Sequence, residues 1–243
     1  MHPLALGSVI AETLAWAKAR LNFLALVILL ADIAPMTMVA AFVPADPSLK
    51  FDFKAFEAHM AVAVIFGAFT QAVVFARMTV DYFSAPEDRL SHSAIAGHVF
   101  LPLLGLAVVT SAATLLGLLA FIAPGVVIAL MWALAAPALV AERLSIPAAL
   151  SRSSQLTQGQ RWRILGLALF LIAAALLSSL LWDLIFQLIH RGPAATPLPL
   201  WYHVGQEAFT GVIGVLGVVG LMVVYNRLRQ LSGKSPGAEL QAR

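Results

Sequence analysis

The sequence predicts an all-α membrane protein with six transmembrane helices and amphipathic interfacial helices on its cytoplasmic side. Of the 243 residues, 61% are hydrophobic and 11% are charged, whereas about 25% of the residues of an ordinary soluble domain are charged. The mean hydropathy is +0.91, and six apolar stretches qualify as candidates to cross the hydrocarbon core of a bilayer. These observations exclude a soluble globular enzyme and a disordered chain.

Each span is expected where about 20 apolar residues follow one another, because unpaired backbone groups cannot be left in hydrocarbon. The expected spans are residues 22–43, 59–83, 98–122, 126–141, 164–189 and 204–225. The fourth is short and needs tilt or bilayer thinning. Only Ala123, Pro124 and Gly125 separate it from the third, so we expect a tight turn there. Residues 1–230 then form one transmembrane domain, and residues 231–243 form a short flexible cytoplasmic tail.

The distribution of Lys and Arg predicts that both termini face the cytoplasm. Six spans place both termini on one side, and cytoplasmic loops are enriched in Lys and Arg. Cytoplasmic termini would place twelve basic residues on that side and three on the other. The twelve are Lys18, Arg20, Arg77, Arg89, Arg143, Arg152, Arg161, Arg163, Arg227, Arg229, Lys234 and Arg243, and the three are Lys50, Lys54 and Arg191. We expect the first span to stay uncleaved, because charged residues precede it and no small-residue cleavage site follows a short apolar region.

Three short segments ahead of the odd-numbered spans have the pattern of helices lying at the cytoplasmic membrane surface. They are residues 8–20, 86–97 and 146–157. Each gathers apolar residues on one helical face and keeps charged or polar residues off it. The chain can therefore be interpreted as three degenerate repeats of a surface helix followed by two spans. The alternative is that these segments are ordinary amphipathic loops, and the sequence leaves both interpretations open.

The most distinctive stretch lies between the fourth and fifth expected spans. It reads Pro137-Ala-Leu-Val-Ala-Glu142, then Ala148-Ala-Leu-Ser-Arg152-Ser153, then Gln155-Leu-Thr157-Gln-Gly159-Gln-Arg161-Trp162-Arg163. This stretch resembles the membrane domain attached to some bacterial glycerophosphodiester phosphodiesterases, and the free-standing inner-membrane proteins built from that domain alone. In that family a proline-containing span ends in a glutamate, and an A-L-x-R-S-x-x-L-T-x-G-x-x-W-R surface segment leads into the next span. The turn at residues 123–125 and the segment at residues 225–229 also resemble the corresponding parts of that family. The chain departs from the family at Ser154, where the family often has a bulky residue.

The resemblance implies a bacterial inner-membrane protein without the family's catalytic barrel. Phosphodiesterase chemistry belongs there to a separate soluble barrel of about 250 residues, for which this chain has no room. Its loops do not offer the paired carboxylates, histidines and metal ligands that phosphodiester hydrolysis requires, and it contains no cysteine. We therefore expect no catalytic residue, no metal site and no cofactor. The dispersed basic residues give no support for a nucleic-acid partner.

Asp32 is the one carboxylate expected near the middle of a span, three residues before Pro35. A charge at that depth costs several kcal/mol unless it is paired, protonated or hydrated, so a polar pocket or proton relay is one interpretation. The other is a protonated side chain that caps carbonyl groups freed by a proline kink. The sequence does not decide between them.

Five cytoplasmic-side residues are candidates for contact with lipid headgroups. They are Arg77, Arg152, Arg161, Trp162 and Arg163. The last four lie in or beside the family-like surface segment, where guanidinium groups match phosphate geometry and tryptophan anchors at the interface. Arg77 has Asp81 four residues later on the same helical face, so an ion pair within the helix is its ordinary explanation. Membrane docking without a specific lipid site would use the same residues.

Ionisable residues also gather near the opposite membrane surface. Asp183 lies near the end of the fifth span and Glu207 near the start of the sixth, with His190, Arg191 and His203 at similar depth. Two carboxylates and two histidines suggest a metal site, but the short i, i+4 spacing of a strong metal motif is missing. We favour the interpretation that they are solvated interfacial charges.

Four glycines recur at every third position of the sixth span: Gly211, Gly214, Gly217 and Gly220. Glycines at this density let neighbouring helices approach closely. We favour packing within the bundle over a dimer interface as their role.

Three functional hypotheses follow from this sequence. The first is a non-enzymatic inner-membrane protein that binds or organises lipids, or scaffolds partners, in envelope maintenance. The second is a transporter or translocase of a lipid or lipophilic small molecule, which would use Asp32 and the interrupted third and fourth spans. The third is a membrane-embedded accessory subunit of a larger complex. Membrane lipids are the expected partners, with a homo-oligomer or a membrane-protein partner as a further possibility.

Overall fold

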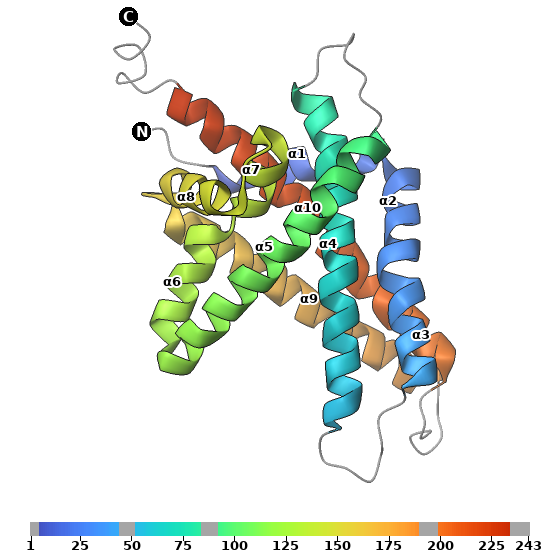
Figure 1. Ribbon diagram of the computed structural model, residues 1–243. Coiled ribbons are helices and arrows are strands. Elements are labelled where there is room, and N and C mark those ends of the chain that lie inside the picture. The colour runs from blue at the N-terminus through green and yellow to red at the C-terminus, as the bar shows by residue number, and fades with distance from the viewer. Residues whose placement is uncertain (1–4, 44–51, 84–91, 190–198, 234–243) are drawn as a thin grey trace, which may run out of the picture.

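The computed structural model describes residues 5–43, 52–83, 92–189 and 199–233, and within these ranges the chain is helical and contains no strand. The expected all-α class is therefore confirmed. The elements in chain order are α1 (Leu6–Ala19), α2 (Leu21–Ile28), the π-helical turn η1 (Leu29–Ile33), α3 (Ala34–Phe42), α4 (Phe53–Phe83), α5 (His92–Ala120), α6 (Ile122–Trp132), α7 (Ala135–Glu142), α8 (Ile146–Thr157), α9 (Arg161–Ile189) and α10 (Leu200–Gly233) (Figure 1).

Six of these helices or helix runs are long and apolar enough to cross a membrane, as predicted. They are Leu21–Phe42, Phe53–Phe83, Ala96–Ala120, Ile122–Glu142, Arg161–Ile189 and Leu200–Ser232. Most begin before or end beyond the expected limits, as Phe53–Phe83 and Leu200–Ser232 do. Residues 231–233 of the expected tail belong to α10, and residues 234–243 lie outside the described part of the chain.

The turn between the third and fourth spans was wrongly placed at residues 123–125. The structure interrupts the helix at Phe121 alone, and α6 begins at Ile122. Pro124 fits the first turn of α6 because its missing N–H has no partner to lose there. The hairpin closes where Gly117 faces Gly125, since a Cβ at position 117 would lie only 2.8 Å from the Cα of Gly125.

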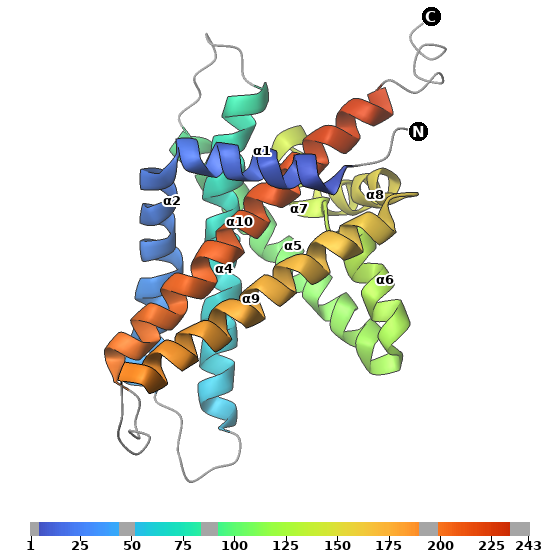
Figure 2. The ribbon, with the colours of Figure 1, turned by 180° about the vertical axis from the view of Figure 1, so that it is seen from behind.

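Two of the three expected surface segments form helices of their own. Residues 8–20 correspond to α1, and residues 146–157 to α8. Figure 2 shows α1 lying across α10 rather than along it, close to the end of the bundle that also carries α8. Of the segment 86–97, residues 86–91 lie outside the described residues, and residues 92–97 continue directly into α5. Among the described residues, a separate surface helix therefore precedes only the first and fifth spans.

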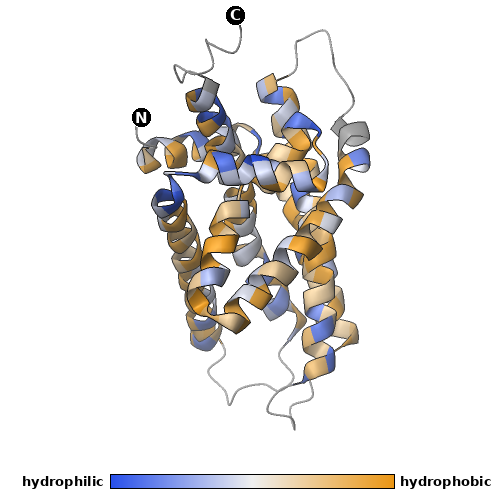
Figure 3. Ribbon diagram, turned by 60° about the vertical axis from the view of Figure 1, so that its left-hand side comes forward, coloured by the Kyte–Doolittle hydropathy of each residue, from blue (hydrophilic) through white to orange (hydrophobic). Residues whose placement is uncertain are grey.

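The buried core lies where α1, α4, α7 and α10 meet. Its largest fully buried side chains include Phe75 and Met78 of α4 and Met222 and Tyr225 of α10. The long helix α9 and the α5–α6 hairpin instead expose apolar residues along most of their length. Figure 3 shows apolar residues covering most of the long helices and hydrophilic residues gathering at the end that carries α1 and α8. This distribution fits a bundle whose flanks contact lipid hydrocarbon.

The fourth span is broken between α6 and α7, and α8 supplies the hydrogen bonds that the break leaves unmade. Pro137 has no N–H, so the helix cannot continue its regular ladder through this point. The hydroxyl of Ser153 accepts a hydrogen bond from the N–H of Leu134 (3.1 Å) and donates one to the carbonyl of Met131 (2.7 Å). Ser153 is fully buried. Ser153 thus joins α8 to the interrupted fourth span by two hydrogen bonds.

We expect Ser153→Ala to lower the free energy of unfolding by about 1–3 kcal/mol, because it leaves the N–H of Leu134 without its partner and the carbonyl of Met131 with only the longer bond from Thr157 (3.4 Å). Thermal unfolding of the detergent-solubilised protein measures this change. Ser151→Ala is the matched control, since Ser151 is exposed on the same helix. Equal stability of the two variants would contradict this role of Ser153.

Candidate functional site

One end of the bundle, which we call the basic end, carries most of the positive charge. It comprises α1, α8, the last turns of α4, α7 and α10 and the first turn of α9 (Figures 1 and 2). Its described cations are Lys18, Arg20, Arg77, Arg143, Arg152, Arg161, Arg163, Arg227 and Arg229, and its described carboxylates are Glu12, Asp81 and Glu142. The described charges near the other end are Lys54 with Asp52, Glu57, Asp183 and Glu207. Counted over the described residues, the two ends therefore differ in the sign of their net charge.

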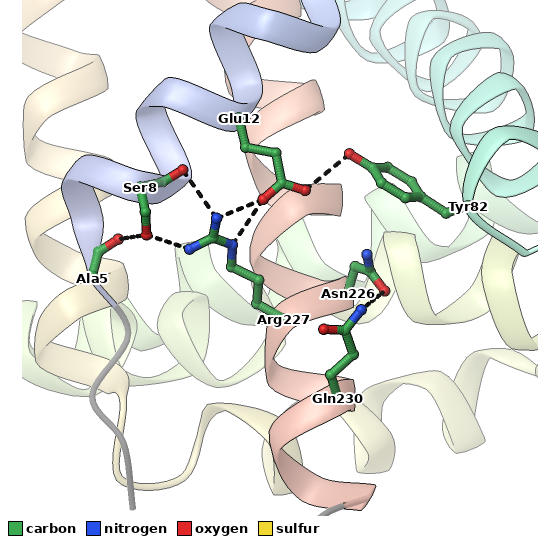
Figure 4. Close-up of polar contacts among 7 residues, drawn as sticks. All are labelled: Ala5, Ser8, Glu12, Tyr82, Asn226, Arg227 and Gln230. Carbon is green, nitrogen blue, oxygen red and sulfur yellow. Dashed lines mark hydrogen bonds and ion pairs between the residues drawn. The ribbon is translucent and has the colours of Figure 1, made fainter.

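Glu12 joins α1 to α10 and α4 at the basic end (Figure 4). Its Oε2 accepts hydrogen bonds from Nη2 (2.6 Å) and Nε (2.9 Å) of Arg227, and its Oε1 accepts one from the hydroxyl of Tyr82 (3.2 Å). Arg227 also donates to the carbonyl (3.1 Å) and the hydroxyl of Ser8. All these contacts fix α1 across the last turns of α10, so the surface helix is attached by directed bonds as well as by apolar packing.

Asp81 of α4 holds the junction between α1 and α2. It accepts from Arg20 (2.9 Å) and from the indole N–H of Trp16 (3.2 Å), and Arg77 lies 3.6 Å away on the preceding turn. The guanidinium of Arg20 also lies over the Trp16 ring, 4.7 Å from its centroid. The structure thus pairs Arg77 with Asp81 inside one helix. This ion pair was the ordinary explanation of Arg77, and a lipid contact was the other.

Glu142, the last residue of α7, makes the third junction. It accepts a hydrogen bond from the Tyr225 hydroxyl (2.5 Å) and from Nε of Arg152 on α8 (3.2 Å), and Arg229 of α10 lies 3.8 Å away. Arg229 also stacks over the ring of Phe83 at 4.8 Å. Arg152, which we expected at a lipid headgroup, therefore has a carboxylate partner within the protein.

No described carboxylate pairs with Lys18 of α1, with Arg143 after α7 or with Arg161 at the start of α9. The Nε of Arg161 is buried without a hydrogen-bond partner among the described residues. The neighbouring Trp162 is 85% exposed. The start of α9 thus offers an unpaired guanidinium next to an exposed indole, on the side of the bundle that carries α8.

A second group of ionisable residues lies inside the bundle and converges from three elements. Asp32 stands in η1, and its Oδ2 is buried without a partner among the described residues. It interacts electrostatically with Glu207 of α10, and Glu207 interacts with His59 of α4. His59 in turn interacts with His203, one turn of α10 before Glu207. Sequence analysis placed Glu207 and His203 at the surface and did not connect them with Asp32.

Asp183 does not join this group. Its Oδ1 accepts a 2.5 Å hydrogen bond from Tyr202, and the indole N–H of Trp182 donates to the Tyr202 carbonyl at 3.0 Å. The Trp182 ring also lies against Gly205, where a Cβ would come within 2.0 Å of it. Asp183 is therefore part of a contact that joins the ends of α9 and α10. His190 and Arg191, the other members of the expected cluster, lie outside the described residues.

The glycines of the sixth span differ in what they contact. A Cβ at Gly211 would lie 3.2 Å from the Cβ of Asp32, so this glycine permits η1 and α10 to touch. Gly214 has open space around it, whereas Gly217 and Gly220 would make only ordinary contacts at 3.5 Å and 3.7 Å. Of these four regularly spaced glycines, Gly211 is thus the one at a close approach between two elements.

Comparison with protein-family models, with curated proteins and with solved structures found no match for this chain. The resemblance to the phosphodiesterase membrane domain stays a prediction. In the ranges that the structure describes, no group of three or more His, Cys, Asp or Glu residues could hold a metal ion. The arrangement itself offers two candidate sites: the unpaired cations of the basic end and the ionisable group around Asp32.

We expect Glu12→Gln to lower the free energy of unfolding by about 1–2 kcal/mol, because the Arg227 guanidinium would lose its counter-charge. Glu12 and Arg227 keep 31% and 30% of their side-chain surface exposed, which makes this cost smaller than that of breaking a fully buried pair. Chemical denaturation in mixed micelles measures it. The control is Glu57→Gln, an exposed glutamate at the other end. A loss of the same size in both variants would mean that the Glu12 contacts add no stability.

Proposed function

We propose that this protein is a multi-pass protein of the bacterial inner membrane that binds anionic lipids at its basic end and catalyses no reaction. In this proposal the basic end and both termini face the cytoplasm. The charge difference between the two ends supports the orientation, because Lys and Arg are enriched on the cytoplasmic side of membrane proteins. The family-like segment supports the bacterial inner membrane as its location.

The observation that carries the proposal is the pair Arg161 and Trp162 at the start of α9. Phosphate oxygens match the planar donor set of a guanidinium, and an exposed indole is stable at the headgroup level. Most other arginines of the basic end already have carboxylate partners within the protein. Arg161 lacks one among the described residues, and Lys18 and Arg143 add positive charge on the same end. A lipid phosphate would supply the missing counter-charge.

The paired arginines give the lipid site a rigid support. Glu12, Asp81 and Glu142 each bind side chains from other helices, so α1 and α8 keep fixed positions relative to the spans. A protein held in this way can organise lipids around it without a large change of shape. The exposed apolar side of α9 leaves room for a second copy or another membrane protein, as expected for a scaffold.

The second candidate function is transport of a lipophilic molecule. The ionisable group around Asp32 favours it, because ionisable residues inside membrane bundles often belong to transport pathways. Polar side chains would have to continue from Asp32 toward the basic end to form a path. The segment Leu21–Ile28, which leads there on the same span, contains Asn22 as its one polar residue and no ionisable residue. We therefore place lipid binding first.

The proposed orientation predicts which surface positions are reached from outside the cell. In intact cells, a membrane-impermeant maleimide should label Lys54→Cys and leave Lys18→Cys unlabelled until the membrane is permeabilised. The chain contains no cysteine, so each variant carries a single reactive thiol and the unsubstituted protein is the blank. Labelling of Lys18→Cys but not Lys54→Cys in intact cells would reverse the orientation.

Lipid binding predicts a preference for anionic headgroups that depends on Arg161. Native mass spectrometry of the delipidated protein should show tighter binding of phosphatidylglycerol than of phosphatidylcholine. We expect Arg161→Gln to weaken phosphatidylglycerol binding about fivefold, since a cation near a membrane surface contributes about 1 kcal/mol. Lys54→Gln removes the same charge at the other end and should change binding little. Equal binding of the two lipids, or equal effects of the two variants, would contradict a site at Arg161.

A further inference from the structure

We propose that Asp32 and Glu207 form a proton-binding pair inside the bundle, loaded from the end opposite the basic end through His203 and His59. This function goes beyond lipid binding and does not depend on it. The pair joins η1 of the first span to α10 at the point where Gly211 lets the two elements touch. Occupancy of the pair by a proton would therefore control the contact between these elements.

The π-helical turn exists because of Pro35 and presents Asp32 toward α10. Pro35 lacks the N–H that a regular helix would use, and the N–H of Ala34 bonds the carbonyl of Leu29, one residue further back than in an α-helix. Single π-helical turns of this kind are frequent at functional sites. A Cβ at position 211 would lie 3.4 Å from the Oδ2 of Asp32. The carboxyl group thus lies against the backbone of α10 instead of capping the kink.

The four ionisable residues lie at increasing depth from the opposite end. His203 and Glu207 are three and seven residues from the start of α10, and His59 is six residues from the start of α4. At 1.5 Å per residue, these positions lie about 5, 10 and 9 Å along their helices. Asp32 is ten residues from the end of α3, or about 15 Å. The group therefore leads stepwise from the surface toward the middle of the first span.

Proton transfer along this group needs no other reactant. The Nδ1 of His59 donates a hydrogen bond to the carbonyl of Ala55 at 2.7 Å, because a carbonyl can only accept. Its Nε2 is then the nitrogen that takes up a proton and releases it. A proton that His59 receives from His203 passes to Glu207 and from there to Asp32. Each histidine is neutral again, and Glu207 is again a carboxylate, once it has released the proton.

The surroundings favour a proton on the pair. Two carboxylates close together in an apolar environment cannot both ionise at low cost. No described cation lies on α2, η1 or α3 to offset them. On the packed helices α4 and α10, the described charged or titratable groups nearer the opposite end are Lys54, Glu57, His59 and His203, whereas Arg77, Asp81, Arg227 and Arg229 lie at the basic end. Asp183 on α9 is bonded to Tyr202. When both carboxyls ionise, their repulsion separates η1 from α10.

Infrared spectroscopy tests this proposal directly, because protonated carboxyl groups absorb apart from carboxylates. In liposomes at neutral pH, the unsubstituted protein should show a protonated-carboxyl signal that disappears on titration to alkaline pH. Asp32→Asn and Glu207→Gln should each remove about half or more of that signal, since the two groups share it. Glu57→Gln, an exposed control on α4, should leave the signal unchanged.

A second experiment tests the route by which the proton reaches Asp32 and Glu207. After a pH jump on the side opposite the basic end, His59→Gln should slow the change in the carboxyl signal about tenfold or more and keep its full size.

If Asp32→Asn fails to fold, Glu207→Gln and His59→Gln still test the proposal. Absence of the signal from the unsubstituted protein, or its full retention in Glu207→Gln, would overturn the proposal. So would an equal spectral change caused by sodium ions at constant pH, which would identify a metal cation as the ligand. Lipid binding is measured separately, so either proposal can fail alone.

Discussion

The structure depends on the pairing of three carboxylates with arginines from other helices at one end of the bundle. Glu12, Asp81 and Glu142 lie on α1, α4 and α7, and their arginine partners come from α10, from the α1–α2 junction and from α8. Within hydrocarbon, apolar side chains gain little by leaving lipid for protein, so polar contacts and close packing must position the helices. By placing these contacts at one end of the bundle, the chain avoids the cost of charge buried deep inside it. The surface helices α1 and α8 thereby become part of the bundle.

Two spans are interrupted near a proline, and the structure treats the two interruptions differently. At the break between α6 and α7, the hydroxyl of Ser153 replaces the missing backbone partners on both sides. At the π-helical turn before Pro35, the nearby polar side chain is Asp32, and its Oδ2 bonds none of the described groups. Where a helix interruption has only a packing role, its polar groups are expected to form hydrogen bonds, because each polar group left without one in a membrane costs free energy. The unbonded carboxyl oxygen of Asp32 therefore sets the interruption of the first span apart from that of the fourth.

The sequence predicted the spans well, because hydropathy over about 20 residues is a local property that the bilayer itself selects. It predicted that α1 and α8 are separate helices for the same reason, since their patterns are also local. It could not predict that Arg227 binds Glu12 across 215 positions of the chain, because no periodicity connects such residues. The glycine pattern of the sixth span was misleading in one respect. Gly205, outside the pattern, makes the tightest approach, and its cause is the ring of Trp182 on another helix.

The helix α10 joins the ionisable group around Asp32 to the Glu12 contacts of the basic end, because it carries Glu207 and Arg227. Glu207 and Arg227 lie twenty residues apart on one continuous helix, a separation of about 30 Å. A straight helix transmits a displacement along its length, whereas the first span is divided by the π-helical turn and can bend there. If η1 and α10 separate at Gly211, the bend in the first span absorbs the motion on one side. On the other side, the motion reaches Arg227 and hence α1 through Glu12. The ionisable group around Asp32 and the basic end are thus connected through α10, which packs against η1 and α3 and also against α1, α7 and α8.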